Sequence, residues 1–181
     1  MKKLTTRKFA YMALFIALVF VFSKIFQIPY TTPFGNTRFH LGNVLCILAG
    51  LILGPVHGGL SAGLGSALFD MTSPLYISSA PTTFINKFAM AWVAGWYFHK
   101  HTKASEKTRI ILASVLGQVT YIILYLLKTF ISNYYIMGLT KEAVMVEIVQ
   151  KAGVSSINGI ISVIVASILA PILLKNIKFD D

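Results

Sequence analysis

Apolar residues run along the chain in six long stretches, separated by shorter segments that hold most of the charges. An α-helix rises about 1.5 Å per residue, so about 20 apolar residues cross the hydrocarbon core of a bilayer. The pattern predicts an all-α integral membrane protein with six transmembrane helices in a single domain, residues 1–181. The predicted spans are 9–28, 41–53, 57–71, 81–98, 109–131 and 152–174.

The second and third stretches are shorter than a full span and are joined by the segment GPVHGG. Two interpretations stay open. The two helices either tilt and use flanking residues to cross the bilayer, or they form a re-entrant hairpin. In both cases the chain returns to the side from which it entered.

The composition agrees with a membrane location. Only 12% of the residues are charged, against about 25% in an average soluble domain. The net charge of +10 would suggest nucleic-acid binding in a soluble protein. The basic residues here lie mainly at the ends of the apolar stretches, so membrane topology explains them better. We therefore expect no nucleic-acid partner.

Lysine and arginine residues lie mainly on one side of the predicted membrane. The positive-inside rule then places both termini and the segment HKHTKASEKTR in the cytoplasm. The segments 29–40, 72–80 and 132–151 are expected to face outward. The basic residues on the cytoplasmic side are Lys2, Lys3, Arg7, Lys8, Lys100, Lys103, Lys107, Arg109, Lys175 and Lys178.

Apart from Arg109 at the cytoplasmic end of the fifth span, four charged residues fall within the predicted spans, and all four lie in the outer halves. They are Lys24, Asp70, Lys87 and Lys128. A charged side chain at a helix centre costs roughly 2.5–3.5 kcal/mol on insertion scales, and such residues often mark functional sites. The alternatives are that the lysines snorkel to the interface or make structural hydrogen bonds, and that Asp70 ends its helix.

Polar side chains share one face on each of the last three predicted helices, again towards the outside. Such stripes either hold helices together in lipid or line a pocket that combines aromatic walls with a few polar groups. The stripes consist of Thr83, Asn86 and Lys87, of Gln118, Tyr121, Tyr125 and Lys128, and of Ser155, Asn158 and Ser162.

The first predicted helix carries a face of small residues, Ala10, Ala13 and Ala17. Small residues allow helices to approach closely in membranes. This face could pack inside the bundle or form a platform for another subunit.

The residues that membrane enzymes need are missing. The sequence has no P-loop and no ligand-spaced cluster for a metal. The segment GLGSALF is similar to the serine motif of rhomboid proteases, but no histidine follows His101 to act as the base. We therefore expect no enzymatic activity and no bound cofactor, and active transport would need an external energy source.

Three segments resemble the S components of energy-coupling factor (ECF) vitamin transporters. They are AYMALFIAL, TRFHLGNVLCILAGLILGPVHGGLSAGLGSALFDM and SSAPTTFINKFAMAWVAG. The specific part is R-x-x-L-G-N, followed by L-G-P-x-x-G-G and G-x-G-S. The chain looks most like the branch that includes S components for pyridoxine, hydroxymethylpyrimidine, pantothenate and folate.

The resemblance implies the high-affinity substrate-binding subunit of an ATP-driven importer in the bacterial cytoplasmic membrane. Such a subunit captures a water-soluble vitamin near the extracellular face, under the first outer loop as a lid. An ECF transmembrane coupling subunit, driven by two ATPase subunits that hydrolyse the ATP, docks on the alanine face of the first helix. The S component then topples in the membrane and releases its substrate inside.

We expect ten residues of the outer half to bind the vitamin, because the polar stripes fall where the site of this family lies. The resemblance favours pyridoxine or hydroxymethylpyrimidine, with pantothenate next and folate a weaker fit. The ten residues are Lys87, Asn86, Thr83, Tyr121, Tyr125, Lys128, Asn158, Asp70, Arg38 and His40.

Two other functions remain as alternatives. A stand-alone facilitator would need polar residues in the inner halves to line a path through the membrane, and these halves are almost purely apolar. A structural membrane partner without its own transport energy would not need the buried lysines.

Overall fold

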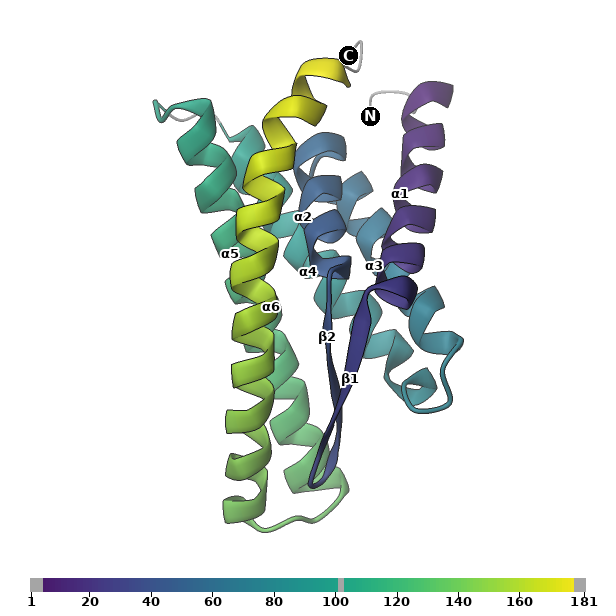
Figure 1. Cartoon of the computed structure of the whole chain (residues 1–181), viewed down its shortest axis with the longest axis vertical. Helices are drawn as coiled ribbons and strands as arrows, with labels where there is room; N and C mark the ends of the chain where they lie inside the picture. The colour runs from purple at the N-terminus through teal and green to yellow at the C-terminus, as the bar shows by residue number, and fades with distance from the viewer. Residues whose placement is uncertain (1–4, 101–102, 178–181) are drawn as a thin grey trace.

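The computed structural model describes residues 5–100 and 103–177, which form a helical bundle with one β-hairpin. Both ends of the chain lie at the same end of the bundle, and the hairpin runs towards the other end (Figure 1). The elements in chain order are α1 (Thr6–Ile25), β1 (Gln27–Thr32), β2 (Gly35–His40), α2 (Gly42–Leu53), α3 (Pro55–Met71), η1 (Ile77–Ser79), α4 (Ala80–His99), α5 (Glu106–Ile131), η2 (Ser132–Ile136) and α6 (Lys141–Asn176).

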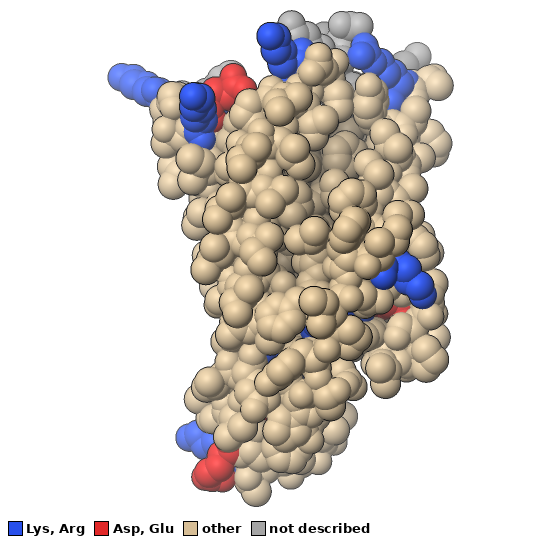
Figure 2. Space-filling view, viewed as in Figure 1, with Lys and Arg blue, Asp and Glu red and all other residues tan. Residues whose placement is uncertain are grey.

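Among the described residues, three helical segments are long and apolar enough to cross a membrane. They are α1, the continuous segment Glu106–Ile136 and α6. The surface between the two ends of the bundle carries few charged side chains, and most exposed lysine and arginine side chains gather at the end that holds the termini (Figure 2). This placement agrees with the expected orientation, although Lys2, Lys3 and Lys178 lie outside the described residues.

Helix α2 forms the centre of the bundle. All twelve of its residues are buried, because the near-continuous apolar run NVLCILAGLIL can face neighbours on every side. It packs against all five other helices. Twelve residues rise only about 18 Å, so α2 is too short to cross a membrane by itself.

Glycines bring α2 and α4 into backbone contact. A Cβ atom added at Gly95 would lie 2.5 Å from the carbonyl oxygen of Gly50, and one added at Gly50 would overlap the carbonyl oxygen of Ala91. Only glycine allows this approach, which is typical of helices that pack in lipid. The inner part of the bundle is therefore closely packed.

The first outer segment differs from the expected loop. The first helix ends at Ile25 rather than at residue 28, and residues 27–40 form an antiparallel hairpin in which Gln27 pairs with His40 and Thr32 with Gly35. The segment is rich in β-branched and aromatic residues, which favour extended backbone.

Helix α6 begins at Lys141, whereas the sequence predicts a loop as far as residue 151. Thr140 caps its N-terminus by accepting a hydrogen bond from the amide of Ala143 at 3.4 Å. Glu147 and Lys151, which lie in the segment assigned to a loop, are buried. The outer part of α6 therefore reaches past the hairpin and packs against it.

Candidate binding site

One cavity of about 80 Å³ lies between the hairpin, α3, η1, α4, α5 and α6. It is enclosed by the hairpin on one side and by the helices on the other. All ten residues expected from the sequence line it: Arg38, His40, Asp70, Thr83, Asn86, Lys87, Tyr121, Tyr125, Lys128 and Asn158. They come from five elements, β2, α3, α4, α5 and α6.

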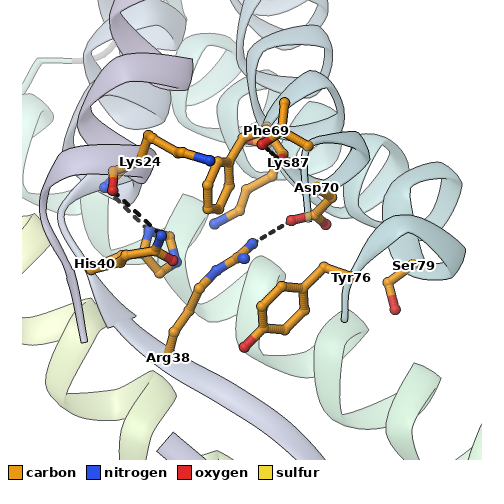
Figure 3. Close-up of polar contacts among 12 residues, drawn as sticks. Lys24, Arg38, His40, Phe69, Asp70, Tyr76, Ser79 and Lys87 are labelled. Carbon is orange, nitrogen blue, oxygen red and sulfur yellow. Dashed lines mark hydrogen bonds and ion pairs between the residues drawn. The ribbon is translucent and has the colours of Figure 1, made fainter. Parts of the chain in front are cut away.

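Arg38 extends from β2 into the cavity and joins the hairpin to α3. Its guanidinium group forms an ion pair with Asp70 at the end of α3. The guanidinium carbon lies 4.3 Å from the ring centroid of Phe69 and 4.1 Å from that of Tyr76, so the group sits between the two rings (Figure 3). Asp70 thus holds a cation and does more than end its helix.

Lys87 points inward from α4. Its side chain donates a hydrogen bond to Oδ1 of Asn43 on α2, and its Nζ atom lies 3.7 Å from the ring centroid of Tyr121. Only 3% of the residue is exposed, so the alternative that Lys87 snorkels to the interface is wrong. Among the described residues, no carboxylate lies within ion-pair distance of Lys87.

Asn158 of α6 holds the base of β2. Its Nδ2 atom donates to the carbonyl oxygen of Arg38 at 2.9 Å, and its Oδ1 atom accepts from the amide of His40 at 3.2 Å. Two polar groups of the β2 backbone, which has β1 on only one side, therefore find their partners on a helix.

His40 is held in one neutral tautomer. Its Nδ1 atom accepts a hydrogen bond from the amide of Gly42 at 3.2 Å, which requires an unprotonated Nδ1. Burial, and then the charges of Lys87 and Arg38, lower the pKa of His40 well below 6.5. The ring is therefore neutral at physiological pH, and its Nε2 atom is a hydrogen-bond donor.

Helix α5 supplies a wall of aromatic rings and one more cation. Tyr121 and Tyr125 stack with 5.7 Å between their ring centroids, and the hydroxyl of Tyr125 donates to Oγ1 of Thr37 at 3.2 Å. Lys128 donates to Oγ of Ser79 at 3.1 Å. It therefore crosses to η1.

Sequence reasoning missed several residues that line the same cavity. Thr37 lies on β2, Phe69 lies near the end of α3, Tyr76 lies just before η1, and Ser79 ends η1. No helical spacing connects these residues. Lys151 was assigned to a loop. It stands four residues before Ser155, so extending the stripe of the sixth helix by one turn would have found it.

The tip of the hairpin is fixed by Glu147 of α6. The carboxylate accepts hydrogen bonds from Oγ1 of Thr32 at 2.5 Å and from the amide of Phe34 at 3.3 Å. It also forms an ion pair with Lys151 at 2.9 Å. Together with Asn158, this residue ties the hairpin to α6 at its tip and at its base.

The alanine face of α1 lies on the outside of the bundle. Ala10, Ala13 and Ala17 are exposed, and the last two line a shallow apolar groove between α1 and α3. The alternative that this face packs inside the bundle is therefore wrong. Lys24 is also exposed and does not line the cavity.

Comparisons with known proteins give three similarities. The family model described as "ECF-type riboflavin transporter, S component" matches residues 3–178. A protein of Pyrococcus woesei, named "Uncharacterized protein in gap 3'region", is 30% identical over 155 residues, which are 86% of this chain and 99% of that protein. A structure of the S component of a bacterial ECF transporter has the same fold, with a TM-score of 0.62, 20% identity and coverage of 96% of this chain and 98% of that chain.

Proposed function

The chain belongs to the S component family of ECF-type riboflavin transporters, and from this premise we propose that it captures a water-soluble vitamin or vitamin precursor with high affinity at the outer side of the membrane. Members of this family are integral membrane proteins that bind substrate for a transporter and are not enzymes. The observation that carries the proposal is the convergence of ten polar and aromatic residues on one cavity in the expected outer half.

The hairpin acts as the lid of the site. The cavity of about 80 Å³ is smaller than typical ligand pockets of roughly 300–1,000 Å³, so a vitamin requires the lid or the Arg38 side chain to move. Ion pairs and hydrogen bonds hold the hairpin on both sides, through Asp70 on α3 and through Glu147 and Asn158 on α6. These contacts support a lid that closes over its ligand and opens as a unit.

Four vitamins form the set of candidate ligands. The sequence resemblance favours pyridoxine or hydroxymethylpyrimidine, with pantothenate next, and the name of the matching family adds riboflavin. Stacked tyrosines and hydrogen-bond donors suit a flat heterocycle, and the cations suit a carboxylate.

Energy for uptake comes from partners. The family associates with an ECF transmembrane subunit and with ATPase subunits, and we propose that the transmembrane subunit docks on the exposed face of Ala10, Ala13 and Ala17. The chain itself binds no cofactor, and ATP is hydrolysed by the two ATPase subunits. The backbone contact between α2 and α4 disfavours a stand-alone facilitator, because it leaves no room for a path between these two helices.

Mass spectrometry of small molecules released from the purified full-length chain tests the proposal. We expect a vitamin or vitamin precursor that also rebinds to the emptied protein, and uptake by cells only when the coupling and ATPase subunits are present. The proposal fails if no small molecule is released and if none of the four candidate vitamins binds.

A further inference from the structure

The charges around the cavity do not balance. Four cationic side chains line it, namely Arg38, Lys87, Lys128 and Lys151. Among the described residues, only two carboxylates form ion pairs with these cations: Asp70 pairs with Arg38, and Glu147 pairs with Lys151. Within the described part of the chain, Lys87 and Lys128 therefore have no carboxylate partner, and the site carries an excess of two positive charges.

Two of these cations face each other across the cavity. The ammonium group of Lys87 and the guanidinium group of Arg38 point towards the same space (Figure 3). The Nη1 atom of Arg38 is buried and has no hydrogen-bond partner. Lys87 has three N–H donors, of which one is used by Asn43 and another faces the ring of Tyr121.

This arrangement is costly as it stands. Like charges repel more strongly in a site of low polarity than in water, and a buried cation is tolerated when an anion or several acceptors surround it. Loss of the proton from Lys87 would not remove the problem, because arginine keeps its charge and Nη1 of Arg38 would still lack an acceptor.

We propose that the ligand carries an oxyanion, a carboxylate or a phosphate, which binds between Nζ of Lys87 and Nη1 of Arg38. An oxyanion accepts hydrogen bonds from both groups and neutralises one of the two unpaired charges. Neutral His40 also lines the cavity, and its Nε2–H group would add a donor without adding charge. This inference rests on the proposed function, and it places acidic candidates such as pantothenate ahead of neutral pyridines and pyrimidines.

Matched pairs of compounds test the inference on the purified full-length chain. The pairs are pantothenate with pantothenol, flavin mononucleotide with riboflavin, and pyridoxine 5′-phosphate with pyridoxine. Isothermal titration calorimetry at pH 7.5 gives the Kd of each compound. In whichever pair binds, we expect the anionic compound to bind at least tenfold more tightly than its neutral partner.

Variants of Lys87 identify the group responsible. Lys87→Met should weaken binding of the anionic compound at least tenfold more than binding of its neutral partner and so remove the preference for the anion, and Lys87→Arg should keep most of the preference because it keeps the charge. Lys24→Met is the matched control, because Lys24 is exposed and lies outside the cavity. It should leave every Kd unchanged.

The outcomes separate this inference from the proposed function. Equal or tighter binding of the neutral members, release of a neutral vitamin from the purified chain, or an unchanged preference in Lys87→Met would each overturn the inference while the vitamin-binding function stands. If nothing is released and no compound binds, the proposed function falls and the inference falls with it. The comparison of pairs on the unaltered chain needs no variant, so it decides the matter even if Lys87→Met does not fold.

Discussion

At the scale of single residues, Arg38 joins the hairpin to the helices through two different properties of one side chain. Its charge pairs with Asp70, and its flat face lies against the rings of Phe69 and Tyr76. Arginine suits both tasks because its guanidinium group is planar and stays charged. Truncation of either partner would leave the other charge buried, so the ion pair can open only when another group replaces it.

His40 gives a prediction about pH. Because the folded chain lowers the pKa of His40, the unfolded chain binds a proton near pH 6.5 that the folded chain does not bind, and stability falls as the pH drops below 6.5. Asparagine in its place would still accept the hydrogen bond from Gly42 but would not titrate. Between pH 7.5 and 5.5, the unaltered chain should lose more stability than His40→Asn, by up to about 1.4 kcal/mol.

Thermal or denaturant unfolding of the detergent-solubilised proteins at the two pH values provides the measurement. The other histidines are present in both proteins, so their contributions cancel in the comparison. The same pH dependence in both proteins would show that His40 does not remain neutral in the fold.

At the scale of elements, the contact between α2 and α4 depends on the absence of side-chain atoms. A methyl group at Gly50 would overlap the backbone of Ala91, and its displacement would separate two helices at the centre of the bundle. The hairpin, by contrast, is attached through side-chain hydrogen bonds that can break and form again. The fold thus combines a rigid inner part with an outer part that can open.

Gly50→Ala should destabilise the bundle by about 1–3 kcal/mol or more, as overpacking does in closely packed cores. Gly153→Ala is the matched control on α6, because no atom lies within 4 Å of the position that its Cβ would take. It should leave stability unchanged or raise it by up to about 1 kcal/mol. Equal unfolding temperatures for Gly50→Ala and the unaltered protein would argue against the backbone contact.

The alanine face of α1 can be tested with bulky side chains. The double variant Ala13→Trp and Ala17→Trp should reduce ATP-driven uptake at least tenfold, because two indole groups would fill the groove between α1 and α3. Ligand binding by the isolated chain should not change, since the groove lies outside the cavity. Uptake assays in cells that hold the coupling subunits, together with binding assays on the purified chain, provide the two measurements.

Ile168→Trp with Ile172→Trp provides the control, since both residues are exposed on α6 at the same helical spacing. This pair should leave uptake intact. Normal uptake by the alanine-face variant would remove that face from partner docking.

The sequence predicts most helices to within a few residues. A long apolar run in a bilayer forms a helix because its backbone hydrogen bonds must be made within the protein. It fails where charged residues are buried by distant partners. The segment that holds Glu147 and Lys151 is assigned to a loop, but Glu147 accepts a hydrogen bond from the hairpin and Lys151 pairs with Glu147. The same limit applies to the cavity. Helical spacing identifies Lys87 and Tyr121 as lining residues, whereas the position of Tyr76 depends on the path of an irregular segment.

At the scale of the whole molecule, the two ends of the bundle differ. The end that holds the termini carries most exposed basic side chains (Figure 2), and the polar cavity lies nearer the other end, beneath the hairpin. The positive-inside rule then predicts a cavity that loads from outside the cell.

Labelling with a membrane-impermeant maleimide tests this orientation. Lys141→Cys at the start of α6 should react in intact cells, whereas Lys107→Cys at the start of α5 should react only after lysis. Both positions are exposed, and the natural Cys46 is fully buried. The opposite labelling pattern would place the cavity on the cytoplasmic side.

The buried α2 helix has an electrical consequence. Because its twelve residues and its glycine contacts with α4 leave an apolar layer beneath the cavity, an ion crossing there would have to leave water for a medium of low dielectric constant, which costs many kcal/mol. We therefore expect the idle protein to conduct neither protons nor metal ions. A cell could keep many unloaded copies in its membrane without dissipating the membrane potential that its other transporters use.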